Sequence, residues 1–261
     1  MLRPRIIPCL LVQNSGLVKT NRFKQPKYVG DPLNAVKIFN EKEADELILL
    51  DIDATIKGGE PNFDLISKLA AECRMPMCYG GGVTSVEQAT RIIDMGVEKV
   101  ALSNAAITNP LLLTKIANVV GRQSVVAVLD VRKKSGISTS GYEVCTHNGK
   151  VTHKCDPFIL AQVLQDAGAG EIIINSVDND GAMQGYDLNM ALLFRSALKI
   201  PITYLGGAGS LEDMKLLAST VGLVGIAAAS YFVFKGRYRA VLINYPTLQQ
   251  KADICNMIHK E

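Results

Sequence analysis

Acidic side chains follow several short apolar runs of this sequence, at places where a proton could be transferred. Carboxyl groups in such positions act as general acid or base when they are held near a reacting group. We predict that Asp130 and Asp180 take part in catalysis. We interpret Asp51, Asp53 and Asp178 as structural groups that cap a helix or brace a loop.

Two glycine clusters precede helical patterns, and each follows an apolar run opened by a proline. They are Gly80-Gly81-Gly82 and Gly206-Gly207-Ala208-Gly209. Glycine lets the backbone approach a ligand closely, and N–H groups at the start of a helix attract anions. Ser103-Asn104 and Ala229-Ser230 follow the next apolar run in each case. The sequence therefore favours two phosphate sites and a ligand with a phosphate at each end, although tight turns would also explain the glycines.

Four charged residues stand at the starts of apolar runs that we expect to be strands. Arg5, Glu46, Lys99 and Glu171 could form a ring of ion pairs across one end of a barrel, which we call the floor ring. Taken alone, the pattern is typical of a network that stabilises the N-terminal face of a barrel.

Apolar runs alternate with amphipathic stretches along the whole chain, which predicts a parallel sheet with crossover helices. The expected strands are Arg5–Leu11, Glu46–Ile52, Met75–Tyr79, Glu98–Leu102, Ser124–Val131, Glu171–Ser176, Pro201–Leu205 and Gly222–Ala228. The expected helices include Pro32–Lys42, Phe63–Cys73, Val86–Met95 and Pro157–Ala167. At this length we predict a (β/α)₈ TIM barrel, with an open doubly wound sheet as the alternative.

An internal repeat favours the barrel. The segment Asp45–Asp53 after Asp31-Pro32 resembles Gly170–Asp178 after Asp156-Pro157, and the offset is 125 residues (171 minus 46). The glycine clusters recur at nearly the same distance. We therefore predict a single domain over residues 1–261, built from half-barrels of about 1–123 and 124–261.

Two stretches interrupt the alternation. We interpret Gln13–Gly30 as a long first loop, a lid or binding segment that carries Lys19. Gly141–Cys155 contains Asn148-Gly149 and predicts a hairpin. Its cysteines and histidines could suggest zinc, but strand alternation would place Cys145 and His147 on one face and His153 and Cys155 on the other. We therefore predict no metal site.

Composition excludes several classes of protein. The 261 residues carry a formal net charge of +3, which is too weak to indicate nucleic acid binding by itself. Six cysteines without a regular spacing suggest reduced thiols and a cytoplasmic protein. We expect no signal peptide and no membrane helix, because no apolar run approaches the ~20 residues that a span requires.

Several segments resemble the HisF family, the cyclase subunit of imidazole glycerol phosphate synthase, over essentially the whole chain. They are Arg5–Leu10, Gly30–Pro32, Asp45–Leu47, Gly80–Gly82, Ser176–Gly181, Gly185–Asp187 and Gly206–Gly209. The resemblance implies a (β/α)₈ barrel that pairs through its N-terminal face with a HisH-like glutaminase, whose ammonia passes through the barrel.

The resemblance also assigns roles to individual residues. It places the four residues of the floor ring on the family's ion-pair gate at the ammonia entrance. It makes Lys19 the lysine of the mobile first loop that closes over the substrate, which we therefore also predict to be catalytic, and Asp130 one of two catalytic aspartates. Together with the reading of the glycine clusters, it gives the expected phosphate-binding residues Gly82, Asn104, Gly181, Gly207, Ala229 and Ser230. No cofactor is expected.

The sequence departs from the family pattern in the reaction pocket. Leu11 stands where the second catalytic aspartate is expected, and leucine cannot exchange a proton. Cys78, Ser103, Asn175 and Leu205 replace residues that are typically Thr, Asn, Thr and Ser. An intact gate with an altered pocket resembles HisF-like paralogues that help to supply nitrogen for acetamidino groups on bacterial surface sugars.

The leading hypothesis is therefore an ammonia-channelling subunit of a glutamine-dependent amidotransferase. Besides the glutaminase, its expected partners are a phosphorylated small molecule and a sugar amidotransferase that receives the ammonia. One alternative is a genuine cyclase of histidine biosynthesis. The other is a non-catalytic scaffold that activates the glutaminase.

Overall fold

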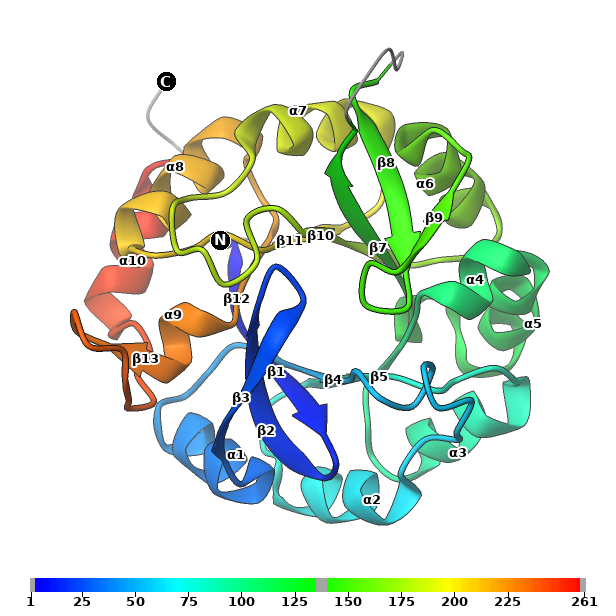
Figure 1. Cartoon of the computed structure of the whole chain (residues 1–261), viewed down its shortest axis with the longest axis horizontal. Helices are drawn as coiled ribbons and strands as arrows, with labels where there is room; N and C mark the ends of the chain where they lie inside the picture. Colours follow the sequence, from blue (N-terminus) through cyan, green and yellow to red (C-terminus); the bar gives the residue numbers. More distant parts are fainter. Residues whose placement is uncertain (1–2, 135–139, 259–261) are drawn as a thin grey trace.

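Eight parallel strands close into a barrel in the computed structural model, which describes residues 3–134 and 140–258 (Figure 1). The strands are β1 (Arg5–Gln13), β4 (Leu47–Asp51), β5 (Met77–Gly80), β6 (Lys99–Leu102), β7 (Val125–Lys133), β10 (Glu171–Ser176), β11 (Ile202–Leu205) and β12 (Gly225–Ala228). Each pairs with its neighbour in chain order, β10 pairs with β7, and β12 pairs with β1. The predicted fold is confirmed, and every expected strand is present with ends shifted by three residues or fewer.

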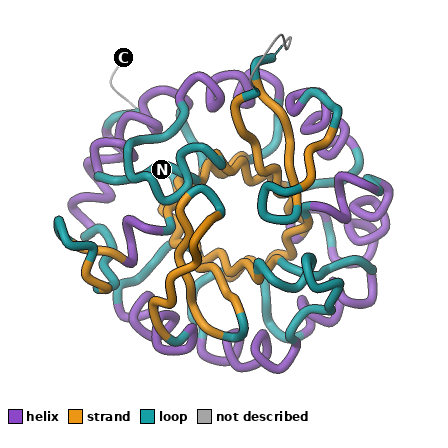
Figure 2. The backbone as a smooth tube through the Cα atoms, in the orientation of Figure 1, coloured by secondary structure: helices purple, strands orange, loops and turns teal. Residues whose placement is uncertain are grey.

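Helices cover the outside of the barrel as a ring, which the tube in Figure 2 shows around the strands. They are α1 (Pro32–Glu41), α2 (Phe63–Glu72), α3 (Val86–Asp94), α4 (Asn104–Thr108), α5 (Leu111–Val120), η1 (Arg122–Ser124), α6 (Pro157–Asp166), α7 (Leu188–Ala197), α8 (Leu211–Val221), α9 (Ser230–Val233) and α10 (Leu248–Asn256). The four helices predicted from periodicity are confirmed to within one residue at their C-terminal ends.

The helix caps repeat with the internal symmetry. Asp31 and Asp156 cap α1 and α6, and each is followed by proline in the first helical turn. Ser85 and Ser210, equally far apart in the sequence, cap α3 and α8. A side-chain oxygen at these positions accepts a hydrogen bond from an otherwise unpaired N–H group. The same local chemistry therefore starts corresponding helices in both halves.

The first interruption is a hairpin rather than the long loop that we predicted. β2 (Gly16–Asn21) pairs with the end of β1 and with β3 (Lys24–Gly30), and all of these pairings are antiparallel. Two-residue turns join the strands, with positive φ at Asn14 and Ser15 and at Arg22 and Phe23. Such turns usually contain glycine. Neither of these turns contains glycine, so neither could be recognised from the sequence.

The second interruption is the predicted hairpin, made of β8 (Tyr142–Thr146) and β9 (Val151–His153). Cys145 pairs with Thr152. The placement of the two histidines on opposite faces is wrong, because His147 lies in the turn with a positive φ. Thr146 Oγ1 lies 3.0 Å from His147 Nδ1 and 2.9 Å from His153 Nε2. Both hairpins lie in front of the barrel in Figure 1.

The C-terminal part of the chain returns to the first two strands. A short hairpin of β13 (Phe234–Lys235) and β14 (Ala240–Val241) precedes α10. Tyr245 donates a hydrogen bond to the Ile6 carbonyl at 2.7 Å and accepts one from the Asp45 N–H at 3.0 Å. The buried Lys251 of α10 reaches the Asp45 carboxylate at 3.0 Å. These contacts fasten the last helix to β1 and to the segment before β4.

Two apolar cores follow from strands that are buried on both faces. The larger core lies between the strands and the helices. The smaller core, which we call the bore cluster, lies inside the barrel and receives side chains from all eight strands: Ile7, Cys9, Leu11, Ile48, Cys78, Ala101, Val126, Val128, Ile173, Leu205 and Ala227, together with Val18 of β2.

Helix α5 offers a matched test of the outer core. Leu113 is fully buried, whereas Leu111 of the same helix is 67% exposed. We expect Leu113→Ala to lower the free energy of unfolding by about 2 to 5 kcal/mol through lost transfer energy and a residual cavity. Leu111→Ala should change it by no more than about 0.5 kcal/mol. Chemical denaturation of both variants measures the difference, and equal losses would contradict the placement of α5.

Candidate functional site

A cavity of about 360 Å³ opens at the C-terminal ends of the first-half strands. Its walls come from the loops after β4, β5 and β6, from the end of β7, and from the tips of both hairpins. Gly82 and Asn104, two of the predicted phosphate-binding residues, lie in this wall. Gly82 has a φ of +74°, and a Cβ there would lie 2.9 Å from the Gly59 carbonyl oxygen, so only glycine fits this turn.

Asp130 is the carboxyl group at the bottom of this cavity. Asn175 Nδ2 donates a hydrogen bond to Asp130 Oδ1 at 2.9 Å. Burial raises the pKa of Asp130 to about 7, with a smaller contribution from Asp180, while the Asn175 hydrogen bond opposes the rise. A carboxyl group with a pKa near neutrality can both accept and donate a proton. Leu11 lines the same cavity and supplies only apolar surface.

The first hairpin places Lys19 inside the barrel. Its side chain is buried, and Nζ donates to the Cys9 carbonyl oxygen at 2.6 Å. Burial lowers the pKa of Lys19 to about 8, against the opposing influence of Cys9 and Asp180. Thr20 Oγ1, next along the strand, donates to Asp180 Oδ2 at 3.0 Å. Lys19, Asp130 and Asp180, predicted as catalytic from the sequence, thus surround the mouth of the barrel.

The remaining predicted phosphate-binding residues surround a separate, smaller hollow: Gly181, Gly207, Ala229 and Ser230. Its volume is about 10 Å³, which is room for about one water molecule. The hairpin tip crosses beside it, where the Arg22 N–H donates to the Asp180 carbonyl oxygen at 2.9 Å. The structure therefore groups the predicted residues into two sites, of which only the first is large enough for a ligand in this conformation.

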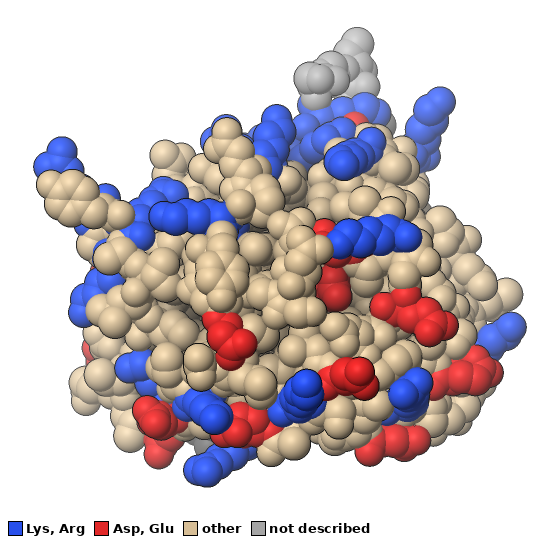
Figure 3. All heavy atoms as spheres, turned by 60° about the horizontal axis from the view of Figure 1, so that its bottom comes forward, with Lys and Arg blue, Asp and Glu red and all other residues tan. Residues whose placement is uncertain are grey.

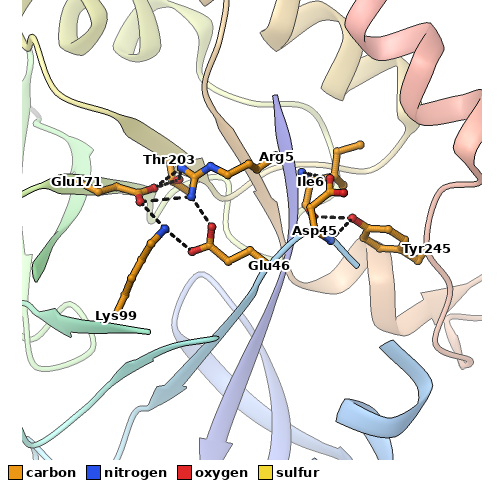
Figure 4. A network of polar contacts seen from close by, with 8 residues as sticks. All are labelled: Arg5, Ile6, Asp45, Glu46, Lys99, Glu171, Thr203 and Tyr245. Carbon is orange, nitrogen blue, oxygen red and sulfur yellow. Dashed lines mark hydrogen bonds and ion pairs between the residues drawn. The ribbon is translucent and has the colours of Figure 1, made fainter. Parts of the chain in front are cut away.

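The four charged residues of the floor ring meet at the opposite end of the barrel (Figure 4). Arg5 pairs with Glu46 and, at 2.6 Å, with Glu171. Lys99 Nζ lies 2.8 Å from Glu46 and 2.9 Å from Glu171. Burial would raise the pKa of Glu171, but Arg5 and Lys99 outweigh it and hold the pKa at about 2.

Apolar side chains separate the floor ring from the mouth. The bore cluster lies in the barrel between them, and Leu11 and Val128 belong both to this cluster and to the wall of the cavity. An ion would lose a large hydration free energy in such surroundings, whereas a small neutral molecule would lose much less. The arrangement therefore places charge at the floor, apolar surface in the middle and titratable groups at the mouth.

Basic side chains gather along the upper edge of the face drawn in Figure 3, whereas basic and acidic side chains are mixed lower down. The exposed cations of the mouth-side segments include Lys24, Lys27, Lys133, Lys150, Lys235, Arg237 and Arg239. A rim of one charge raises the local concentration of ligands of the opposite charge. The mouth is therefore suited to an anionic ligand.

Within residues 3–134 and 140–258, no three side chains of His, Cys, Asp or Glu lie close enough together to hold a metal ion. No helix in this part of the chain combines the length and the apolar character of a membrane span.

The fold and this distribution of groups define a (β/α)₈ barrel with a cavity at its mouth and an ionic floor. Residues 5–239 match the profile of a family described as histidine biosynthesis protein. The chain belongs to this family, among its HisF-like members.

Relatives match over nearly the whole chain. An imidazole glycerol phosphate synthase subunit of Vibrio vulnificus, provisionally named hisF3, is 54% identical over 96% of both chains. A provisionally named HisF subunit of Leptospira interrogans is 53% identical over 96% of this chain and 98% of its own. The provisionally named hisF2 subunit of Pseudomonas aeruginosa is 48% identical with the same coverage.

Some residues of these sites were not predicted from the sequence. Thr20 and Phe23 enter the cavity wall because the first interruption is a hairpin. Thr203 joins the floor ring by donating to Glu171 at 2.5 Å. The alternation of β11 places Thr203 on the bore side, one step below Leu205, and this periodicity was the available signal.

The raised pKa of Asp130 predicts a pH-dependent stability. The folded chain keeps this proton to about pH 7, whereas an unfolded carboxyl group loses it near 3.8, so stability falls as pH rises through this window. The stability of Asp130→Asn relative to the wild type should therefore increase as pH rises through this window and should reach roughly 1 to 3 kcal/mol at pH 8.

Denaturation at pH 4, 6 and 8 measures this gain. The control Asp166→Asn, at an exposed position of α6, should keep the wild-type pH profile. A gain in Asp130→Asn that is the same at pH 4 and pH 8 would show that Asp130 does not titrate in this way.

Proposed function

We propose that this barrel is the ammonia-conducting subunit of a glutamine-dependent amidotransferase, paired at its floor with a HisH-like glutaminase. The observation that carries the proposal is the order of environments along the axis, from a neutral ion ring through an apolar bore to a mouth with titratable groups. Ammonia is small and can cross apolar surroundings in its neutral form. Ammonium is excluded by the same surroundings, because a charged group is far more costly to bury than a neutral one.

The floor ring is the entrance in this proposal. Its two acids and two bases balance one another, so the ring can close the bore without leaving an unpaired buried charge. Arg5 keeps 30% of its side chain exposed, which leaves it accessible to a partner on the outer side. Docking of the glutaminase beneath the floor would deliver ammonia directly to this ring. Separation of Glu46 from Lys99 would then open the path.

The mouth is the place of reaction or transfer. Lys19, with a pKa of about 8, and Asp130, with a pKa of about 7, can both exchange protons near neutral pH. The backbone turn at Gly82 and the amide of Asn104 would bind one phosphate of the ligand. Binding at Gly207 and Ser230 would require the first hairpin to move away from Asp180, and both phosphate sites remain proposals.

The acceptor that we propose is a sugar or nucleotide-sugar intermediate that receives an acetamidino group for a bacterial surface polysaccharide. Leu11 supports this choice over cyclisation, because the cavity holds only one of the two carboxyl groups that the cyclase reaction uses. The ammonia would be used in this cavity or passed to a sugar amidotransferase at the mouth. We propose that this work takes place in the cytoplasm.

Glu46→Ala and Lys99→Ala test transport in a producing bacterium. Each removes two of the ion pairs of the floor ring, so we expect glutamine hydrolysis to continue while acetamidino sugar falls at least about tenfold, the factor that 1.4 kcal/mol represents. The measurements are glutamate released by the purified complex and acetamidino content of the surface polysaccharide. Excess ammonium chloride should restore the sugar.

The control for transport is Lys37→Ala, which removes a surface ion pair with Glu72 at 3.9 Å and should leave both measurements unchanged. Normal acetamidino content in both floor variants would remove transport from the proposal.

A second candidate is the cyclase of histidine biosynthesis. The pKa of Asp130 near 7 favours it, as do the relatives named as imidazole glycerol phosphate synthase subunits. Expression in a histidine auxotroph that lacks its own cyclase subunit separates the two. We expect no growth, because Leu11 cannot serve as the second acid or base. Growth with the wild-type chain, lost in Asp130→Asn, would establish the cyclase instead.

A scaffold role would be favoured if Asp130→Asn left acetamidino sugar at its normal level.

A further inference from the structure

The floor ring has a fifth member that makes it asymmetric. Thr203 on β11 is fully buried, and its Oγ1 donates to Glu171 Oε1 at 2.5 Å (Figure 4). The same hydroxyl oxygen accepts a hydrogen bond from Arg5 Nη2 at 3.4 Å. Glu171 thus has three donors, namely the guanidinium, the Lys99 ammonium and a hydroxyl group. Among the residues that the structure describes, Glu46 accepts hydrogen bonds from the two cations alone.

The neighbouring strand makes room for this hydroxyl group. Gly225 on β12 pairs with Thr203, and a Cβ at Gly225 would lie 1.8 Å from Thr203 Oγ1. The φ of Gly225 is not in the left-handed region, so the backbone conformation does not require glycine there. Space for the threonine side chain is the remaining reason for glycine at this position. Thr203 and Gly225 therefore act as a pair that holds the hydroxyl group against Glu171.

The backbone on both sides of Glu46 is also held by hydrogen bonds. These bonds do not involve the Glu46 carboxylate. The N–H of the preceding residue, Asp45, donates to the Tyr245 hydroxyl oxygen at 3.0 Å, as Figure 4 shows, and the N–H of the following residue, Leu47, donates to the Pro76 carbonyl oxygen at 2.9 Å. Movement of Glu46 is thereby restricted to its side chain. Of the two acids in the ring, the carboxylate of Glu46 is the one with fewer contacts to break.

We propose that Thr203 is a positioning residue that anchors Glu171, so that the floor ring opens by rotation of the Glu46 side chain while Glu171, Arg5 and Thr203 stay together. This inference rests on the proposed function, because a ring that conducts ammonia must open. An anchored half lets the ring open on one side and close again in the same arrangement. Without the hydroxyl group both acids would move, and the bore would be open more often.

Cys78 reports on this opening. It is buried in the bore cluster and is the strand partner of Lys99 of the ring, so it lies close to the floor and can be reached by a reagent that passes the ring. Cys145 is equally buried but lies at the mouth, where its Sγ donates to the Asp130 carbonyl oxygen at 3.6 Å. Methyl methanethiosulfonate is a small neutral reagent, and peptide mass spectrometry gives the rate of labelling at each cysteine in the isolated barrel.

Thr203→Val keeps the shape of the side chain and removes the hydroxyl group. We expect it to speed labelling of Cys78 about tenfold, the size of effect for a hydrogen bond to a charged group, with no change at Cys145. Thr203→Ser keeps the hydroxyl group and should label at the wild-type rate. Gly225→Ala should resemble Thr203→Val, because the added methyl group displaces the hydroxyl group.

Three results would overturn the inference. They are wild-type labelling of Cys78 in Thr203→Val, equally fast labelling in Thr203→Ser, and an equal increase at Cys145, which would mean general unfolding. A carbon-13 NMR titration adds an independent readout. The pKa of the Glu171 carboxyl group, about 2 in the wild type, should rise in Thr203→Val and stay in Thr203→Ser.

These measurements require neither glutaminase nor acceptor. The labelling experiment therefore tests the anchoring of Glu171 independently of ammonia transport. If it contradicts the anchoring, transport is still tested by the Glu46 and Lys99 variants. If those variants contradict transport, the labelling result still holds.

Discussion

The floor ring takes two acids and two bases out of water at one end of the barrel. These buried charges must neutralise one another, and this requirement constrains the rest of the structure. Each charge of the floor ring is tolerated because opposite charges lie within hydrogen-bonding distance, and losing one leaves an uncompensated charge among the other three. The four residues come from β1, β6 and β10 and from the position before β4, so they meet only when the barrel is closed. The ring therefore depends on the complete fold.

The two ends of the barrel have been built for different tasks. At the floor, opposite charges compensate one another and the pKa of Glu171 is held low. At the mouth, carboxyl groups lie in partly apolar surroundings that raise the pKa of Asp130 and lower that of Lys19. The first arrangement keeps charges fixed, and the second brings groups into the range where protons are exchanged. The apolar bore keeps these two environments apart.

The positions of many residues in the barrel could be predicted from the sequence. Hydrophobic periodicity identifies each strand, and the place of a residue along its strand determines which end of the barrel it occupies. The start of a strand is the floor and its end is the mouth, which is why the floor ring and Asp130 could be placed. The hairpin β2–β3 could not, because its turns use Asn14-Ser15 and Arg22-Phe23 where glycine is usual. The separation of the two hollows follows from the position of that hairpin and was equally hidden. Thr203 was overlooked since its role depends on the space left by Gly225, a contact between two strands that no single segment reveals.

The bond between Tyr245 and Ile6 has a consequence for how the chain is made. The first strand leaves the ribosome early, yet its partner β12 and the tyrosine that holds it are synthesised more than two hundred residues later. During that interval one edge of β1 lacks its hydrogen-bonding neighbour, and such edges invite pairing with other chains. Closure of the barrel through its first and last strands therefore leaves this edge of β1 open until β12 has been synthesised.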